Sequence, residues 1–338
     1  MNQKFHNAFL ADNSILLEDF MSHTLYDPKN GYYAKSNVIG KAQDFITAPH
    51  LTSLFSQCIA QWCVDQWVNA GCPTALNLIE LGAGQGIMLR DILIACQTIP
   101  ELSDHIQAYI LEKSASLKSI QKVTLQAHKQ VKWIDHLDSI QRGYTIILAN
   151  EFFDALPIQY YRHTNNEIEE AIITPPRSIS WRQTDVSLPS TSHPIFLKSK
   201  HYEFFVKQIS DLLNRVGGVG LIIDYGDDHP GFTLQAIKNH KKVNFLEHLG
   251  EADLTHHVDF SYLKSLFHAY RINVLGPQKQ SDFLLDLGIA DMLAWVRQRV
   301  ASDKFANHAL AVHRLTSSAE MGELFKVIAI QGGLQNGC

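Results

Sequence analysis

The sequence has little of what marks disordered, disulfide-rich or zinc-stabilised proteins. Only 11 prolines and 19 glycines occur among 338 residues, and 46% of the residues are hydrophobic, so neither disorder nor a collagen-like repeat is indicated. The five cysteines form no Cys-x-x-Cys pair, which argues against a disulfide framework and a structural zinc site. We interpret these cysteines as reduced thiols.

Long apolar runs and an excess of positive charge are also missing. The longest apolar stretches, near residues 145–149 and 218–223, are far shorter than the roughly 18 residues that cross a bilayer. The N-terminus resembles neither a signal peptide nor an Arg-rich transit peptide. The formal net charge is -5, which gives no reason to expect a nucleic-acid partner. We therefore expect no membrane span and a bacterial-type cytoplasmic location.

From residue 75 onward, short apolar segments alternate with amphipathic ones. Strands are expected at 75–81, 107–112, 131–134, 145–150 and 220–225, and helices at 87–96, 114–128 and 202–215. This alternation predicts an α/β fold with a mostly parallel sheet and right-handed crossovers. Residues 325–330 are expected to form a final strand, for which an antiparallel orientation is one option.

The rest of the chain is expected to surround this core, which spans residues 75–338. Helices at about 14–25, capped by Asn13 or Ser14, and at 53–69 predict an N-terminal helical cap over residues 1–74. Two segments, at about 158–197 and 227–262, interrupt the α/β rhythm after the fourth and fifth strands. We expect them to be insertions at one end of the sheet, where α/β proteins place specificity elements.

The most informative segment is a strand that runs into a glycine-rich turn and then a helix. It reads Glu80-Leu81-Gly82-Ala83-Gly84-Gln85-Gly86. Because Ile87 follows, the Gly-x-Gly-x-x-Gly fingerprint of dinucleotide-binding proteins is absent. A Gly-x-Gly-x-Gly turn after an acidic strand end is typical of class I methyltransferases that use S-adenosylmethionine.

Acids at two neighbouring strand ends suit that cofactor. Glu80 is a candidate for the ammonium group of its amino-acid end, and Glu112 for the two ribose hydroxyls. The alternative is a structural turn with surface acids.

The fourth expected strand is followed by Asn150-Glu151-Phe152-Phe153-Asp154. Residues just beyond the carboxyl ends of parallel strands line the ligand-binding edge, so Asn150, Glu151 and Asp154 are expected to face the transferred methyl group. Glu151 and Asp154 share a face if the segment is helical. The alternative is that Asp154 caps a helix N-terminus.

Five motifs in this order resemble the MidA family, which includes the mitochondrial complex I assembly-factor methyltransferase. They lie at residues 44–49, 80–86, 150–157, 223–226 and 252–260, and the resemblance extends from about residue 25 to 326. It implies methyl transfer from S-adenosylmethionine to a protein arginine, with a complex I subunit as one such protein. It also implies that the loop with Asp44 and Thr47 covers the cofactor. Ala83 and Gln85 stand where the family usually has Pro and Arg.

An arginine acceptor agrees with the acids after the fourth strand, since a guanidinium favours paired carboxylates. His257 and Asp259 are spaced to point the same way on an extended segment, with His257 as a proton acceptor or orienter. The alternative for His257 is a structural hydrogen bond. A metal cluster that includes His248, His256 and His257 is not expected, because no ligand-pair spacing supports it.

These considerations give one set of expected site residues. The expected cofactor-binding residues are Asp44, Thr47, Glu80, Gly82, Ala83, Gly84, Gly86, Glu112 and Asn150. The expected catalytic residues are Glu151, Asp154, His257 and Asp259. Two other functions stay open, a small-molecule N- or O-methyltransferase and a non-catalytic assembly factor with this fold. A homodimer is also left open.

Overall fold

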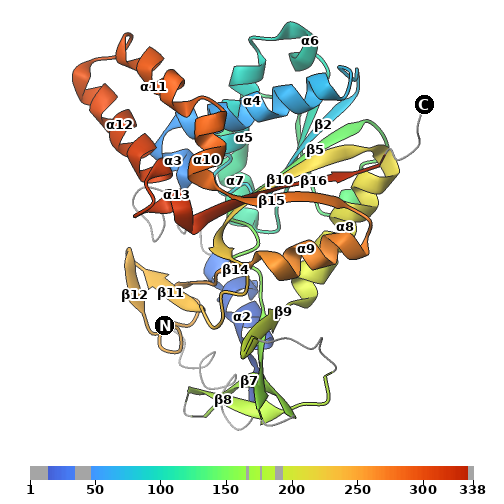
Figure 1. Cartoon of the computed structure of the whole chain (residues 1–338), viewed down its shortest axis with the longest axis vertical. Coiled ribbons are helices and arrows are strands. Elements are labelled where there is room, and N and C mark those ends of the chain that lie inside the picture. Colours follow the sequence, from blue (N-terminus) through green and yellow to red (C-terminus); the bar gives the residue numbers. More distant parts are fainter. Residues whose placement is uncertain (1–13, 35–46, 165–166, 176, 187–192, 334–338) are drawn as a thin grey trace.

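A mixed sheet forms the centre of the protein (Figure 1). The computed structural model describes residues 14–34, 47–164, 167–175, 177–186 and 193–333. The strand order is β15-β16-β10-β5-β2-β3-β4, and β14 (Val258–Asp259) pairs with the end of β10. The parallel strands are β2 (Leu76–Leu81), β3 (Ile106–Leu111), β4 (Val131–Ile134), β5 (Tyr144–Asn150) and β10 (Gly218–Asp227). β15 (Asn273–Lys279) and β16 (Phe325–Gly332) are antiparallel. The expected α/β class is confirmed.

Alternate residues of the central strands enter two different cores, one on each face of the sheet. In β2, for example, Ile79 and Leu81 join one core, whereas Leu76 and Leu78 join the other. The first core includes helices α8 (Lys200–Val216) and α9 (Phe260–Ala269). The second includes α4 (Ser53–Asn69) and α5 (Ile87–Cys96). Burial on both faces explains why the central strands are mostly apolar.

The two segments expected to be insertions form small sheets of their own. Between β5 and α8 lie β6 (Gln159–Thr164), β7 (Glu167–Thr174), β8 (Ser178–Gln183) and β9 (Ile195–Lys198). They form an antiparallel sheet with β1 (Ile15–Leu16), in the lower part of Figure 1. After β10, a second sheet contains β11 (Gln235–Lys238), β12 (Lys241–Val243) and β13 (Asp253–Thr255).

Several short elements and C-terminal helices complete the described chain. Before β16 come α10 (Gln280–Asp286), α11 (Ile289–Arg297), α12 (Ser302–Thr316) and α13 (Met321–Leu324), which the sequence analysis did not predict. The others are η1 (Tyr32–Ala34), α3 (Ala48–Leu51), α6 (Pro100–Ser103), α7 (Ala115–Thr124) and η2 (Leu137–Ser139). Within the described ranges, every helix is too short or too polar to cross a membrane.

The two N-terminal helices expected to form one cap lie in different places. Helix α2 (Leu17–Tyr26) packs near β6 and β7, whereas α4 packs beside α5 on the central sheet (Figure 1). The predicted cap at Ser14 is wrong, because α2 begins after Leu16, whose side chain offers no acceptor for the first-turn N–H groups. The start of α2 must therefore find its acceptor elsewhere.

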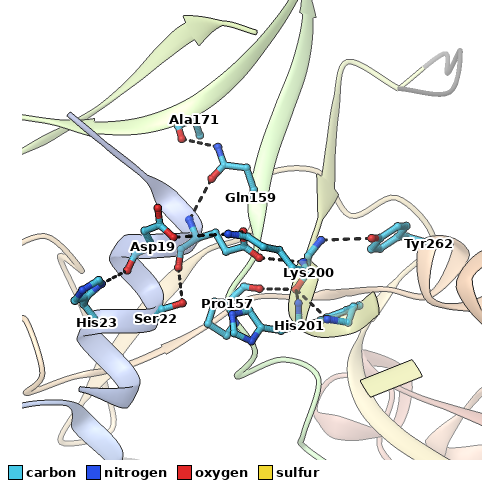
Figure 2. A network of polar contacts seen from close by, with 12 residues as sticks. Asp19, Ser22, His23, Pro157, Gln159, Ala171, Lys200, His201 and Tyr262 are labelled. Atoms are coloured by element: carbon cyan, nitrogen blue, oxygen red, sulfur yellow. Dashed lines mark hydrogen bonds and ion pairs between the residues drawn. The ribbon is translucent and has the colours of Figure 1, made fainter. Parts of the chain in front are cut away.

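That acceptor comes from β6, as Figure 2 shows. The N–H of Glu18 donates to Oε1 of Gln159 (3.1 Å), and Nε2 of Gln159 donates to the carbonyl of Ala171 on β7 (2.7 Å). The carboxylate of Glu18 in turn accepts from the N–H of Lys200 (3.0 Å) and pairs with its Nζ (3.0 Å). Gln159 is 3% exposed. One buried carboxamide thus joins α2 to the first insertion.

We predict that Gln159→Leu destabilises the protein by about 1–3 kcal/mol for each of the two backbone groups that it leaves buried without a partner. Urea unfolding followed by circular dichroism measures this loss. The matched control is Gln61→Leu on the exposed side of α4, which should change the free energy of unfolding by less than about 0.5 kcal/mol. Equal stabilities of the two variants would contradict the capping role.

Candidate functional site

The glycine turn after β2 needs glycine for its backbone conformation. Gly82, Gly84 and Gly86 have φ angles of 63°, 52° and 78°, in the left-handed region that residues with a Cβ rarely adopt. A Cβ at Gly82 would also lie 2.9 Å from Cδ2 of Phe152. At the end of β2 the three glycines of the turn therefore present backbone atoms without side chains of their own. Ala83, within the turn, is 7% exposed.

Two buried acids flank this turn. Glu80, at the end of β2, is 4% exposed, and Glu112, just after β3, is 8% exposed. Burial, with a further contribution from Glu112, raises the pKa of Glu80 to about 8. Among the described residues, Oε2 of Glu80 has no hydrogen-bond partner. A buried acid with an unused oxygen beside bare backbone fits the ammonium group of S-adenosylmethionine, and it disfavours the alternative of surface acids.

A residue that sequence reasoning missed connects the turn to Glu112. Gln121, on α7, is fully buried, and its Nε2 donates to the carbonyl of Gly84 (2.9 Å) and to Oε2 of Glu112 (3.1 Å). Its Oε1 accepts from Nε1 of Trp133 on β4 (2.8 Å). Oε1 of Glu112 accepts from the N–H of Ser114 (2.8 Å). A carboxamide suits this position because it donates and accepts at once.

The segment before α4 lies against the same turn. Oγ1 of Thr47 hydrogen-bonds with Nδ1 of His50 (2.8 Å), and Nε2 of His50 with Oε1 of Gln85 (3.3 Å). The N–H of Ala48 donates to Oε1 of Glu151 (3.4 Å). Thr47 therefore lies near both the turn and the end of β5. Asp44 lies outside the described residues.

The end of β5 brings Asn150 and Glu151 to this edge of the sheet. Asn150 pairs in register with Ile223 of β10, and its Nδ2 donates to Oε1 of Glu151 (3.2 Å). Oδ1 of Asn150 is buried and has no partner in the described part of the chain. Glu151 has a φ of 51°, which is strained for a residue with a side chain. Such strain concentrates at functional sites.

Asp224, on β10, fixes the backbone of the segment that follows β5. Its Oδ2 accepts from the N–H groups of Phe153 (3.0 Å) and Asp154 (3.2 Å), and its Oδ1 from that of Tyr225 (2.9 Å). Residues 151–156 consequently form turns, so the alternative that Asp154 caps a helix is wrong. The sequence motif at 223–226 contained Asp224, but nothing in the local pattern gave it this role.

Asp154 and Glu151 are two neighbouring acids whose pKa values are both raised. Asp154 is 5% exposed, and burial raises its pKa to about 6. Burial and then the charge of Asp154 raise the pKa of Glu151 to about 7. The charge of Asp154 therefore makes Glu151 harder to ionise, and a cation beside the two carboxyl groups would favour their charged forms.

The remaining two expected residues have other partners. Oδ1 of Asp259 accepts from the N–H of Tyr262 (2.9 Å), so this carboxylate caps α9. His257 is half-buried with its ring edge-on to Tyr225 (centroids 5.5 Å apart), and burial lowers its pKa, which keeps it neutral near pH 7. The part of the chain that the structure describes contains no cluster of three or more His, Cys, Asp or Glu that could hold a metal ion.

Comparison with known proteins identifies the family. Residues 58–278, well over half of the chain, match the sequence profile of the S-adenosyl-L-methionine-dependent methyltransferase family Methyltransf_28. The chain belongs to this family. The protein is therefore a methyltransferase and uses S-adenosylmethionine, as the glycine turn and its acids indicate.

Relatives of this methyltransferase support that conclusion over nearly the whole chain. It is 29% identical to the mitochondrial protein arginine methyltransferase NDUFAF7 of Homo sapiens, over 94% of this chain and 80% of that protein. The protein of the same name from Danio rerio is 28% identical, over 96% and 85%. A crystal structure from Burkholderia thailandensis with bound S-adenosyl-homocysteine has a TM-score of 0.81 and 27% identity, over 99% of this chain and 92% of that one.

We predict that cofactor affinity depends on pH through Glu80. Below about pH 8 the Glu80 carboxyl is protonated, and an ammonium group must displace that proton, so S-adenosyl-homocysteine should bind up to about tenfold more weakly for each pH unit below 8. Calorimetric titrations between pH 6 and 8.5 test this. Glu80→Gln should remove the slope, whereas Glu101→Gln at the exposed α6 should keep it. A flat profile in the unmodified protein would exclude Glu80 as the ammonium ligand.

We also predict that Gln121→Leu weakens S-adenosyl-homocysteine binding by about 1–3 kcal/mol, because Gly84 and Glu112 lose their shared donor and the indole N–H of Trp133 is left unpaired. Fluorescence or calorimetric titration measures the change. Gln126→Leu, which alters an exposed glutamine just after the same helix, is the control and should bind normally. Normal binding by both variants would reduce Gln121 to a packing role.

Proposed function

We propose that this enzyme transfers a methyl group from S-adenosylmethionine to a guanidinium nitrogen of an arginine in a protein. The observation that carries the proposal is an excess of acids at one edge of the sheet. Glu80, Glu112, Asp154 and Asp224 are each at most 8% exposed. None of them, nor Glu151, forms an ion pair with a Lys or Arg within the described ranges. Buried carboxylates without cations favour ligands that bring positive charge.

In this proposal one group of acids binds the cofactor and the other binds the acceptor. Glu80 and Glu112, beside the glycine turn, hold the cofactor, which supplies an electrophilic methyl group when bound. Glu151 and Asp154 orient the guanidinium through charge-assisted hydrogen bonds to its forked N–H groups. Positioning of the attacking nitrogen then contributes most of the rate.

Glu151 also has the properties of a proton acceptor. A guanidinium nitrogen that gains a methyl group must lose a proton, and a base is most effective when its pKa lies near the working pH. The pKa of Glu151 is raised to about 7 by burial and by Asp154. We therefore assign the proton to the Glu151 carboxylate, with Asp154 as the second orienting acid.

The printed names of the relatives favour a protein as the acceptor. Those from Homo sapiens and Danio rerio are called protein arginine methyltransferases, which supports an arginine side chain over a small-molecule acceptor. Membership of an enzyme family speaks against a non-catalytic assembly factor. The complex I subunit, the homodimer, the cytoplasmic location, the domain division at residue 74, and site roles for Asp44, His257 and Asp259 stay predictions.

We predict that Glu151→Gln keeps cofactor affinity within about twofold and lowers turnover by roughly 10²–10⁴-fold, because the variant cannot accept the proton. The assay incubates the enzyme, labelled S-adenosylmethionine and proteins from cells that lack its gene, and locates methylarginine by mass spectrometry. Glu101→Gln serves as the control with full activity.

Two outcomes would count against the proposal. Full turnover by Glu151→Gln would remove Glu151 from the acceptor side. Label that enters only metabolites, with no protein methylarginine, would establish the small-molecule alternative instead.

A further inference from the structure

Two stacked tyrosines lie beside the acidic edge, and neither has a role in the function above. Tyr26 is the last residue of α2, and Tyr33 belongs to η1. Their rings stack with centroids 5.4 Å apart and an interplanar angle of 25°. Tyr26 is 39% exposed, although most large side chains of α2 are buried. An exposed ring held in a fixed stack presents aromatic surface to a ligand.

The hydroxyl groups of both tyrosines are already used within the protein. Oη of Tyr26 donates to the carbonyl of Ala155 (2.9 Å), next to Asp154, and Oη of Tyr33 donates to Oδ1 of Asp253 (3.1 Å). The hydrogen-bonding capacity of these hydroxyls is therefore spent on orientation. What remains available to a ligand is the face of a ring.

The two tyrosines are connected through neighbouring residues to both groups of acids, those that hold the cofactor and those that orient the acceptor. The carbonyl of Tyr33 accepts from Oγ of Ser114 (2.8 Å), whose N–H donates to Glu112 on the cofactor side. Tyr26 is joined to Ala155 on the acceptor side. Burial of its hydroxyl end, followed by the charges of Asp253, Asp154 and Glu112, raises the pKa of Tyr26, so this hydroxyl lies within electrostatic reach of both groups of acids.

A buried carboxylate also lies at this place. Asp154 is 5% exposed and interacts with the hydroxyl of Tyr225, and a carboxylate can accept further hydrogen bonds from a ligand. Asp253, 8% exposed, supplies a second buried carboxylate beside the hydroxyl of Tyr33. Aromatic faces and carboxylates together attract cations, and a planar cation can use both.

We propose that Tyr26 and Tyr33, with Asp154 and Asp253, form the surface that binds the acceptor's guanidinium and selects a planar cation over neutral side chains. The proposal rests on the function above and adds its specificity determinants. The guanidinium plane lies against the ring of Tyr26, while its N–H groups reach the carboxylates. A neutral isostere keeps the shape of the ligand and loses both attractions.

The test measures binding of N-acetyl-arginine amide to the full chain saturated with S-adenosyl-homocysteine, by saturation-transfer NMR titration. The neutral isostere N-acetyl-citrulline amide should bind at least about tenfold more weakly, since it carries no charge. Tyr26→Leu should weaken binding of the arginine probe by roughly 3- to 30-fold, the range of a cation–π contact, while Tyr26→Phe, which keeps the ring and loses only the bond to Ala155, should weaken it less. Trp295→Leu, at an exposed aromatic residue on α11, should leave it unchanged.

Three results would overturn the proposal. They are equal binding of the arginine and citrulline probes, no binding of either, and unchanged arginine binding by Tyr26→Leu at normal S-adenosyl-homocysteine affinity. If Tyr26→Leu fails to fold, Asp253→Asn replaces it and should also weaken binding of the arginine probe. If the labelling assay yields protein methylarginine together with any of these results, the proposed function stands and only this binding surface is wrong. Failure of the binding surface is thus distinguished from failure of the proposed function.

Discussion

The arrangement of the site depends on the cost of burying several carboxylates at one edge of a sheet. Glu80, Glu112, Asp154 and Asp224 cannot all carry charge there without donors or cations. The protein meets part of this cost with its own groups, since Asp224 accepts three backbone N–H groups and Glu112 accepts one N–H and the amide of Gln121. Glu80 keeps an unpaired oxygen in the described structure, the Tyr225 hydroxyl interacts with Asp154, and the pKa values of Glu80 and Asp154 are nevertheless raised. Positively charged ligands would offset the remaining cost of burying these carboxylates.

Strand order explains why these acids meet. Strands β3, β2, β5 and β10 are parallel neighbours, so their carboxyl ends lie together although their sequences are widely separated. The two cores fix the sheet from both faces, which leaves this edge as the place where polar side chains gather. Fixed carboxylates of this kind are preorganised for cationic groups and need little rearrangement when ligands arrive.

Local patterns predicted the parts of the fold that depend on local periodicity. Strand β4 and helices α4 and α5 have the predicted bounds, because apolar spacing defines them, helped by Gly71 after α4 and Gly86 before α5. The small sheet of the first insertion was largely missed, since strands such as β8 contain only half-buried and exposed residues and have little apolar signal. Gln121 and Asp224 were missed for another reason. Gln121 joins groups 9, 12 and 37 residues away, and Asp224 accepts from N–H groups 70 and 71 residues away, so apolar periodicity could not reveal either role.

The capping of α2 by Gln159 gives the first insertion a connection to the reacting groups. Helix α2 has ten residues, about 15 Å of rigid rod, with Glu18 anchored to the insertion at one end and Tyr26 beside the acids at the other. Because the helix is rigid, a shift at its first turn moves its last turn by a similar amount. Shortening or reshaping the β6–β9 sheet during evolution would therefore shift an aromatic ring at the reaction edge, so the outlying sheet and the chemistry are constrained to change together.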